Sequence, residues 1–172
     1  VMPAKSVTKE DKSITEMIEE IQQKYNVVGR ETELRKCLAA KLAGRHILLE
    51  GDVGVGKTTL ANGLAKYFSQ EIERVDGDER YSAAKLVGHF DPPLVIDKGY
   101  TWESFFTGPL TKSMQQGSIL FLNELNRMPE GTQNVLLGAM DEGTIIIPKL
   151  GEVMANEGFF IISAMNPAEL IA

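Results

Sequence analysis

The stretch GDVGVGKT, from Gly51 to Thr58, matches the phosphate-binding pattern G-x-x-x-x-G-K-[S/T]. It stands between HILLE at 46–50, whose apolar and β-branched character predicts a buried strand, and a predicted helix that runs to about Ser69. The glycines allow backbone angles at which consecutive N–H groups point toward phosphate oxygens, and the next helix adds its positive N-terminal dipole. Because the pattern should arise by chance in well under ~1% of chains this long, an ordinary glycine turn is the minor alternative.

Two side chains of this loop have specific expected partners. Lys57 is expected to reach the β and γ phosphates of a bound nucleotide, and Thr58 offers its hydroxyl to Mg²⁺. Asp52 places an additional acid near the phosphates. We expect the loop to bind nucleotide through Gly51, Asp52, Val53, Gly54, Val55, Gly56, Lys57, Thr58 and Thr59.

The rest of the chain alternates between predicted strands and predicted helices. A capping box of Ser13 with Glu16 begins the first helix, and residues 1–12 before it are expected to form a flexible leader. Strands that alternate with helices indicate βαβ units, and therefore an α/β fold whose parallel sheet carries helices on both faces. We predict helices over 13–25, 31–43, 110–116 and 130–141, strands over 71–75, 118–122 and 158–167, a hairpin around Leu150 over 144–155, and an irregular segment over 77–107.

Polar residues follow the predicted strands, and in parallel sheets ligands bind at the carboxyl ends of the strands. Asn123 and Glu124 follow one strand, and Asn166 follows another. In P-loop hydrolases, a strand near the phosphate loop ends in an acid that supports Mg²⁺, and the acid after it can orient or deprotonate the water that attacks the phosphate. Glu124 occupies the second of these positions, and Asn123 occupies the first. An amide oxygen still accepts a hydrogen bond from a metal-bound water but carries no charge, so we expect weakened metal support. The alternatives are that Asn123 and Glu124 cap the following helix and that Asn166 is a turn residue.

Composition excludes several other classes of protein. The net charge of −6 gives no overall attraction to nucleic acid, but it does not exclude a local basic patch. The one cysteine, Cys37, lies at helical spacing beside leucines and is expected to be a buried apolar residue, while His46 and His89 form no metal-ligand spacing. The sequence shows neither a membrane-spanning run nor a signal-peptide pattern, so a cytoplasmic setting is expected.

The stretches NVVGR, GDVGVGKTTL, ILFLNELNR and AMNP resemble AAA+ ATPases in their order and approximate spacing. The chain is similar in particular to the MoxR group, which carries an E-[I/L]-N-R sequence like that of Glu124 to Arg127 and a preceding G-P-L like that of Gly108 to Leu110. The resemblance implies a P-loop three-layer fold in which 13–172 form the large nucleotide-binding subdomain and 77–107 include the insertion in the second helix that marks this clade. It also implies that the fifth strand, arginine finger and lid would follow Ala172, so hydrolysis by this chain alone is expected to be weak.

The resemblance also implies roles for residues and partners. Val27 and Val28 would contact adenine through the backbone, Glu124 would be the catalytic base, and Asn166 would sense the γ-phosphate. ATP and Mg²⁺ would be the cofactors. The full-length protein would form a ring hexamer that remodels a protein client, often one with a von Willebrand A domain. A nucleic-acid motor and a nucleotide-dependent switch with little hydrolysis are the alternative functions.

The segment 90–108 carries five of the aromatic side chains and allows two interpretations. Exposed aromatic loops in a ring motor can face the pore and grip a substrate. Irregular segments also need an apolar anchor, so the same side chains can serve to pack this segment against the domain. The aromatic residues concerned are Phe90, Tyr100, Trp102, Phe105 and Phe106.

Overall fold

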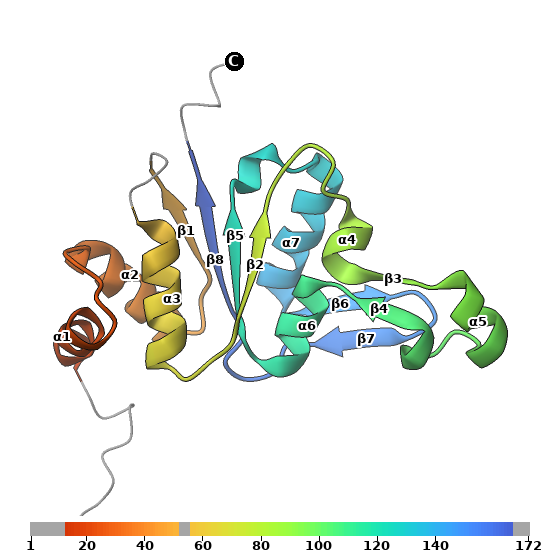
Figure 1. Cartoon of the computed structure of the whole chain (residues 1–172), viewed down its shortest axis with the longest axis horizontal. Helices are drawn as coiled ribbons and strands as arrows, with labels where there is room; N and C mark the ends of the chain where they lie inside the picture. Colours follow the sequence, from red (N-terminus) through yellow and green to blue (C-terminus); the bar gives the residue numbers. More distant parts are fainter. Residues whose placement is uncertain (1–12, 52–55, 167–172) are drawn as a thin grey trace, which may run out of the picture.

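A four-stranded parallel sheet forms the centre of the molecule (Figure 1). This computed structural model describes residues 13–51 and 56–166, so the predicted leader lies outside the described residues. The strand order is β1-β8-β5-β2, and each neighbouring pair is parallel. The strands span Ile47–Glu50 (β1), Ile72–Asp76 (β2), Ile119–Asn123 (β5) and Phe160–Met165 (β8).

Helices cover both faces of this sheet, which confirms the predicted α/β class. Residues 119–122 of β5 are fully buried because Ile119 and Phe121 face one apolar cluster while Leu120 and Leu122 face the other. The first cluster lies under α1 (Ile14–Lys24), α2 (Glu31–Leu42) and α3 (Lys57–Tyr67). The second lies under α6 (Pro109–Gln116) and α7 (Glu130–Glu142).

The predicted boundaries of these elements agree with the structure to within about two residues. Ser13 caps α1 by accepting a hydrogen bond from the backbone N–H of Glu16 at 3.3 Å. Cys37 of α2 is fully buried, as predicted, and burial raises the pKa of its thiol to about 12, with a smaller contribution from Glu33. Two strands extend one residue further than predicted, so that β2 ends at Asp76 and β5 at Asn123. These two added residues are important for the site.

The prediction that 77–107 is irregular is wrong. The segment forms a sequence of short elements: α4 (Ala83–Val87), β3 (Gly88–Phe90), α5 (Pro92–Lys98), the 3-10 helix η2 (Trp102–Ser104) and β4 (Phe105–Thr107). β3 and β4 pair antiparallel. Elements of three to seven residues are too short to show a reliable hydrophobic period, which is why the sequence did not predict them.

Aromatic side chains of residues 77–107, the segment called the insert below, pack mainly on one another. The ring of Phe90 meets the rings of Tyr100 and Phe105 edge to face, each at a centroid distance of 5.0 Å. The Trp102 ring contacts Phe105 in the same way, whereas Phe106 is 53% exposed. Phe105 also belongs to the second apolar cluster of the domain, which agrees with an anchoring role for part of the set. The substrate-gripping interpretation remains a prediction.

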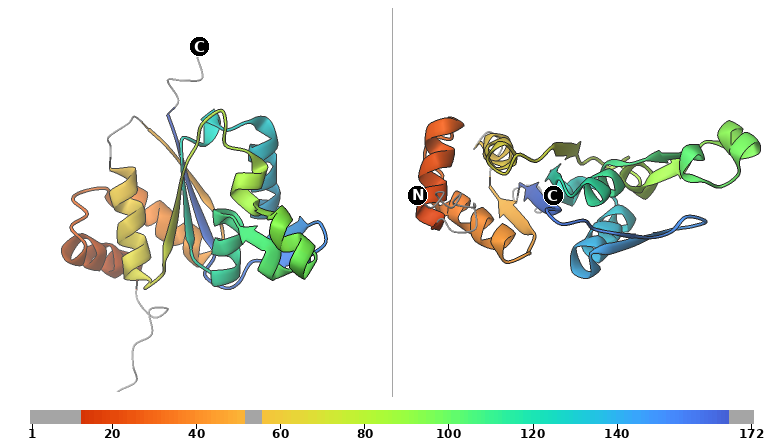
Figure 2. Two further views of the ribbon diagram at one scale, coloured as in Figure 1. Left: turned by 45° about the vertical axis from the view of Figure 1, so that its right-hand side comes forward. Right: turned by 90° about the horizontal axis from the view of Figure 1, so that it is seen from below.

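A hairpin lies beside the insert, at the end of the molecule far from α1 and α2 (Figure 2). It pairs β6 (Thr144–Ile147) with β7 (Gly151–Met154), which confirms the predicted hairpin. Lys149 in its turn places Nζ 5.8 Å from the ring centroid of Tyr100 in the insert. None of the described helices, which lie within 13–51 and 56–166, combines the length and apolar character needed to cross a membrane.

Candidate nucleotide-binding site

The carboxyl ends of the parallel strands bring three predicted site segments to one edge of the sheet. Gly51 follows β1, Asn166 follows β8, and Asn123 ends β5. β8 lies between β1 and β5, so Asn166 is placed between the start of the phosphate loop and the Asn123–Glu124 pair. The backbone N–H of Gly51 donates to the carbonyl of Met165 at 3.2 Å and joins the first two segments directly.

The described part of the phosphate loop leads into α3. Gly56 caps this helix with a left-handed φ of 82°, a conformation that glycine adopts without strain. Lys57 and Thr58 form the first turn of α3, where backbone N–H groups and the helix dipole favour an anion. The Lys57 ammonium donates to the carbonyl of Gly51 at 2.7 Å. Four predicted ligands of the loop, Asp52, Val53, Gly54 and Val55, lie outside the described residues, and Thr59 follows on α3 with an exposed side chain.

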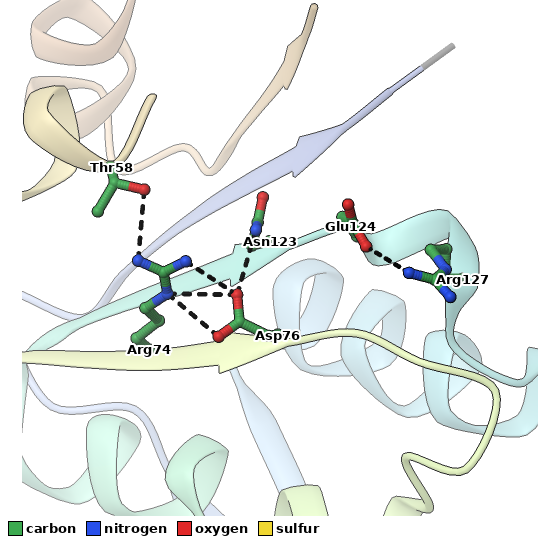
Figure 3. A network of polar contacts seen from close by, with 6 residues as sticks. All are labelled: Thr58, Arg74, Asp76, Asn123, Glu124 and Arg127. Atoms are coloured by element: carbon green, nitrogen blue, oxygen red, sulfur yellow. Dashed lines mark hydrogen bonds and ion pairs between the residues drawn. The ribbon is translucent and has the colours of Figure 1, made fainter. Parts of the chain in front are cut away.

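An arginine and an aspartate on β2 belong to this site, although the sequence analysis did not identify them. Arg74 donates from Nη1 to the Thr58 hydroxyl at 3.4 Å and from Nη2 to Asp76 Oδ1 at 3.0 Å (Figure 3). Its Nε lies 3.2 Å from each oxygen of Asp76. A charged pair two residues apart at the end of a predicted strand was the available signal, but the predicted strand stopped at residue 75.

Asn123 contacts the same aspartate from the neighbouring strand. Asp76 and Asn123 are paired in register, and the Asn123 amide donates to Asp76 Oδ1 at 3.1 Å. The hydrogen bond from Arg74 is the main factor that holds the pKa of Asp76 below its usual range; burial opposes it, and the bond from Asn123 assists it. Asp76 is therefore a stable carboxylate at neutral pH.

Glu124 follows Asn123 and turns the chain sharply away from the sheet. It adopts a left-handed φ of 54° and begins the 3-10 helix η3 (Leu125–Arg127). Its carboxylate accepts a hydrogen bond from Arg127 Nη1 at 2.9 Å, on the side away from Asn123 (Figure 3). Gly77 lies directly beneath this turn, where an added Cβ would come within 2.4 Å of the Glu124 carbonyl oxygen.

The segment predicted to contact adenine lies against α3 and the phosphate loop. Val27 is buried, and a Cβ added at Gly63 of α3 would come within 2.8 Å of its side chain. Val28 is 85% exposed, and the Arg30 guanidinium lies 3.6 Å from the position of a Cβ added at Gly56. The Val27 side chain therefore belongs to the core, so an adenine contact here would involve its backbone and the exposed Val28.

The oxygen groups at this edge suit Mg²⁺ when it arrives with a nucleotide. Thr58, Asp76 and Asn123 present a hydroxyl, a carboxylate and an amide, which are hard donors. Within 13–51 and 56–166, no group of three or more His, Cys, Asp or Glu residues could hold a metal ion by itself. This agrees with the usual behaviour of Mg²⁺, which keeps several waters and binds substrate phosphates together with few protein groups.

Comparisons with known proteins agree with this geometry. The sequence profile of the AAA domain family (dynein-related subfamily) matches residues 46–171. The chain is 33% identical over 153 residues to the uncharacterized protein YojN of Bacillus subtilis, covering 86% of this chain and 50% of YojN. It is 34% identical over 119 residues to protein MoxR of Methylorubrum extorquens, covering 69% of this chain and 33% of MoxR.

A solved structure supports the same assignment. The crystal structure of a "putative ATPase" from Cytophaga hutchinsonii superposes with a TM-score of 0.68 at 26% identity, covering 90% of this chain and 43% of that chain. The chain thus spans half or less of the length of these relatives. Together, the profile match, the relatives and the parallel P-loop fold show that the chain belongs to the AAA+ ATPases, in the dynein-related, MoxR-like group.

Proposed function

We propose that this chain binds ATP with Mg²⁺ and, on its own, hydrolyses it weakly, as the nucleotide-binding subdomain (residues 13–172) of a MoxR-like remodelling ATPase. The observation that carries the proposal is the meeting of Lys57, Asn123–Glu124 and Asn166 at one edge of the sheet. Their side chains come from three non-adjacent parts of the sequence, and their chemical types match the steps of phosphoryl transfer.

The phosphate loop would hold and orient the triphosphate. Lys57 would exchange the Gly51 carbonyl, which its ammonium contacts at 2.7 Å, for the β and γ phosphates. Thr58 would donate its hydroxyl oxygen to Mg²⁺, and Asn123 would accept a hydrogen bond from a metal-bound water. Held by these residues, Mg²⁺ would supply positive charge toward the phosphate oxygens.

Hydrolysis would depend on Glu124 and Asn166. Glu124 would orient the attacking water and accept its proton, for which its carboxylate must turn from Arg127 toward the phosphate. Asn166, at the end of the strand between β1 and β5, would contact the γ-phosphate or the water. Loss of the γ-phosphate would then be transmitted along β8.

The whole protein would act as a ring. Members of this family generally assemble as oligomeric rings, and we propose a homohexamer that remodels a protein client, such as one with a von Willebrand A domain. A cytoplasmic setting remains a prediction. The net charge of −6 makes nucleic acid a poor client, so we expect no salt-dependent binding of duplex DNA.

Calorimetric titration with a non-hydrolysable ATP analogue tests the binding step. Lys57→Met should weaken analogue binding by at least about tenfold, because it removes charge-assisted hydrogen bonds to phosphate. Lys66→Met, at the exposed C-terminal end of the same helix, should leave the affinity unchanged. Equal affinities for wild type and Lys57→Met would contradict the proposal.

One observation favours a second function, a nucleotide-dependent switch with little hydrolysis. The Glu124 carboxylate is engaged by Arg127, and the neighbouring position has an amide instead of an aspartate. If hydrolysis is dispensable, Glu124→Gln should leave the activity of the full-length protein in cells intact. If the chain is part of a motor, the same substitution should abolish that activity.

A further inference from the structure

The ends of β2 and β5 carry an acid and an amide side by side. Asp76 and Asn123 occupy paired positions of parallel strands, and the Asn123 Nδ2 lies 3.1 Å from Asp76 Oδ1. We propose that Asp76 supplies, from β2, the negative charge toward Mg²⁺ that Asn123 cannot supply from β5. This inference rests on the proposed function, and it assigns Asp76 as a metal-positioning residue of that site.

The orientation of the Asn123 amide supports this division of roles. Its NH₂ group is committed to Asp76, and its oxygen points away from that carboxylate (Figure 3). The amide therefore anchors Asp76 and keeps an acceptor directed elsewhere at the strand ends. An aspartate at position 123 would place two carboxylates about 3 Å apart, an arrangement in which both cannot easily ionise. The acid on β2 thus gives a physical reason for the amide on β5.

Arg74 connects Asp76 to the predicted magnesium ligand. Its guanidinium contacts both oxygens of Asp76 and reaches the Thr58 hydroxyl at 3.4 Å. The Arg74 guanidinium thus bridges the carboxylate and the hydroxyl that we assign to the metal site. Arg74 compensates the charge of Asp76 when no metal is bound, and its side chain is 46% exposed, so it has room to move aside.

Asp76 is accessible enough to act on a hydrated cation. Its side chain is 62% exposed, and it lies at the edge of the sheet that carries Thr58 and Asn123. Asp78, two residues further on, is also exposed but accepts its hydrogen bond from the backbone N–H of Arg80. Within residues 13–51 and 56–166, Asp78 makes no hydrogen bond to Arg74 or Asn123, so it serves as a matched control acid.

The experiment measures how strongly Mg²⁺ enhances nucleotide binding. The affinity of a non-hydrolysable ATP analogue is determined by calorimetry with Mg²⁺ and again with EDTA. The ratio of the two affinities is then compared between wild type and each variant. Asp76→Asn should lower this ratio by about 10–100-fold, as loss of an outer-shell partner typically does, while the affinity in EDTA stays near wild type. Asp78→Asn should keep the wild-type ratio.

An exchange of the two side chains gives the sharper test. The double variant Asp76→Asn/Asn123→Asp keeps one acid and one amide at the strand ends, so it should fold like wild type and recover most of the ratio. Mn²⁺ in place of Mg²⁺ gives an independent readout, because its electron paramagnetic resonance signal reports metal held in the analogue complex. Thermal unfolding checks that each variant is folded.

The outcomes separate this inference from the proposed function. The role of Asp76 would be overturned, although ATP binding would stand, in either of two cases. In the first, wild type and Asp76→Asn bind the analogue with the same ratio of affinities in Mg²⁺ and in EDTA. In the second, the wild-type ratio is near one. A double variant that folds but fails to recover the ratio would also overturn the role of Asp76. Absence of analogue binding by wild type in every buffer would overturn the proposed function and this inference with it.

Discussion

Arg127 donates a hydrogen bond from Nη1 to the carboxylate of Glu124 at 2.9 Å, and this contact holds the proposed catalytic base away from Asn123. The two residues are three positions apart across η3, with side chains 44% and 25% exposed, respectively. An ion pair this exposed contributes about 0–1 kcal/mol. The contact is therefore weak enough to break, and we interpret this orientation of Glu124 as a resting position.

Removal of Arg127 should release Glu124. Arg127→Ala is expected to raise the rate of ATP hydrolysis by at most about fivefold, the factor that corresponds to 1 kcal/mol, without changing ATP affinity. Steady-state phosphate release checks the rate. A fall of more than about tenfold, 1.4 kcal/mol, would show instead that Arg127 positions Glu124 or the phosphate.

Replacement of Glu124 should separate binding from hydrolysis. Glu124→Gln keeps the size and left-handed backbone position of the side chain but removes its basicity. The hydrolysis rate should fall by about 10²–10⁴-fold, the usual contribution of a general base, while analogue affinity stays unchanged. Glu130→Gln, an exposed acid in the first turn of α7, is the control and should hydrolyse ATP at the wild-type rate. A Glu124→Gln variant with wild-type turnover would show that another group activates the water.

Gly77 should be essential for the position of Glu124. A Cβ at Gly77 would lie 2.4 Å from the Glu124 carbonyl oxygen, so Gly77→Ala must displace the turn that carries the proposed catalytic carboxylate. We expect hydrolysis to fall more than analogue affinity. Gly138→Ala, within α7 and with no atom near the added Cβ, should instead stabilise the fold by about 0.4–1 kcal/mol. Equal effects of the two substitutions on hydrolysis would contradict this geometry.

Much of the fold was predictable because its signals are local. The apolar run at 118–122 and the phosphate pattern at 51–58 each specify an element from neighbouring residues alone, and alternation of strands with helices then indicates the parallel sheet. The order β1-β8-β5-β2 depends on pairing between strands that are far apart in the sequence, which the local hydrophobic pattern does not indicate. The insert at 77–107 was missed because packing among its aromatic rings, rather than a repeating pattern, holds its short elements together.

Only the part of the site that lies in local sequence motifs was predictable. Lys57, Asn123 and Glu124 follow strands in recognisable motifs, so the sequence places them at one edge. The contact between Asp76 and Asn123 depends on the lateral register of β2 and β5, which a single sequence does not encode in a readable pattern. The turn of Glu124 toward Arg127 depends on one left-handed residue, which the strand pattern did not indicate.

Lys41 gives a test of the fold that is independent of nucleotide. Its ammonium donates to the carbonyl of Gly158 at 3.2 Å and lies 4.8 Å from the ring centroid of Phe68, and burial lowers its pKa from 10.5 to about 8. Between pH 8 and 10.5 the unfolded chain therefore holds a proton at this position that the folded chain has released, so stability from this group rises with pH across that window.

Substitution of Lys41 should remove this pH dependence. In Lys41→Met, the free energy of unfolding should rise less steeply, or fall more steeply, from pH 8 to 10.5 than it does in wild type. Lys36→Met, on the exposed side of the same helix, should retain the wild-type slope. Urea denaturation at several pH values measures the slopes, because the midpoint and m-value give the free energy of unfolding at each pH. Identical slopes for wild type and Lys41→Met would show that the Lys41 ammonium is as well solvated in the folded chain as in the unfolded one.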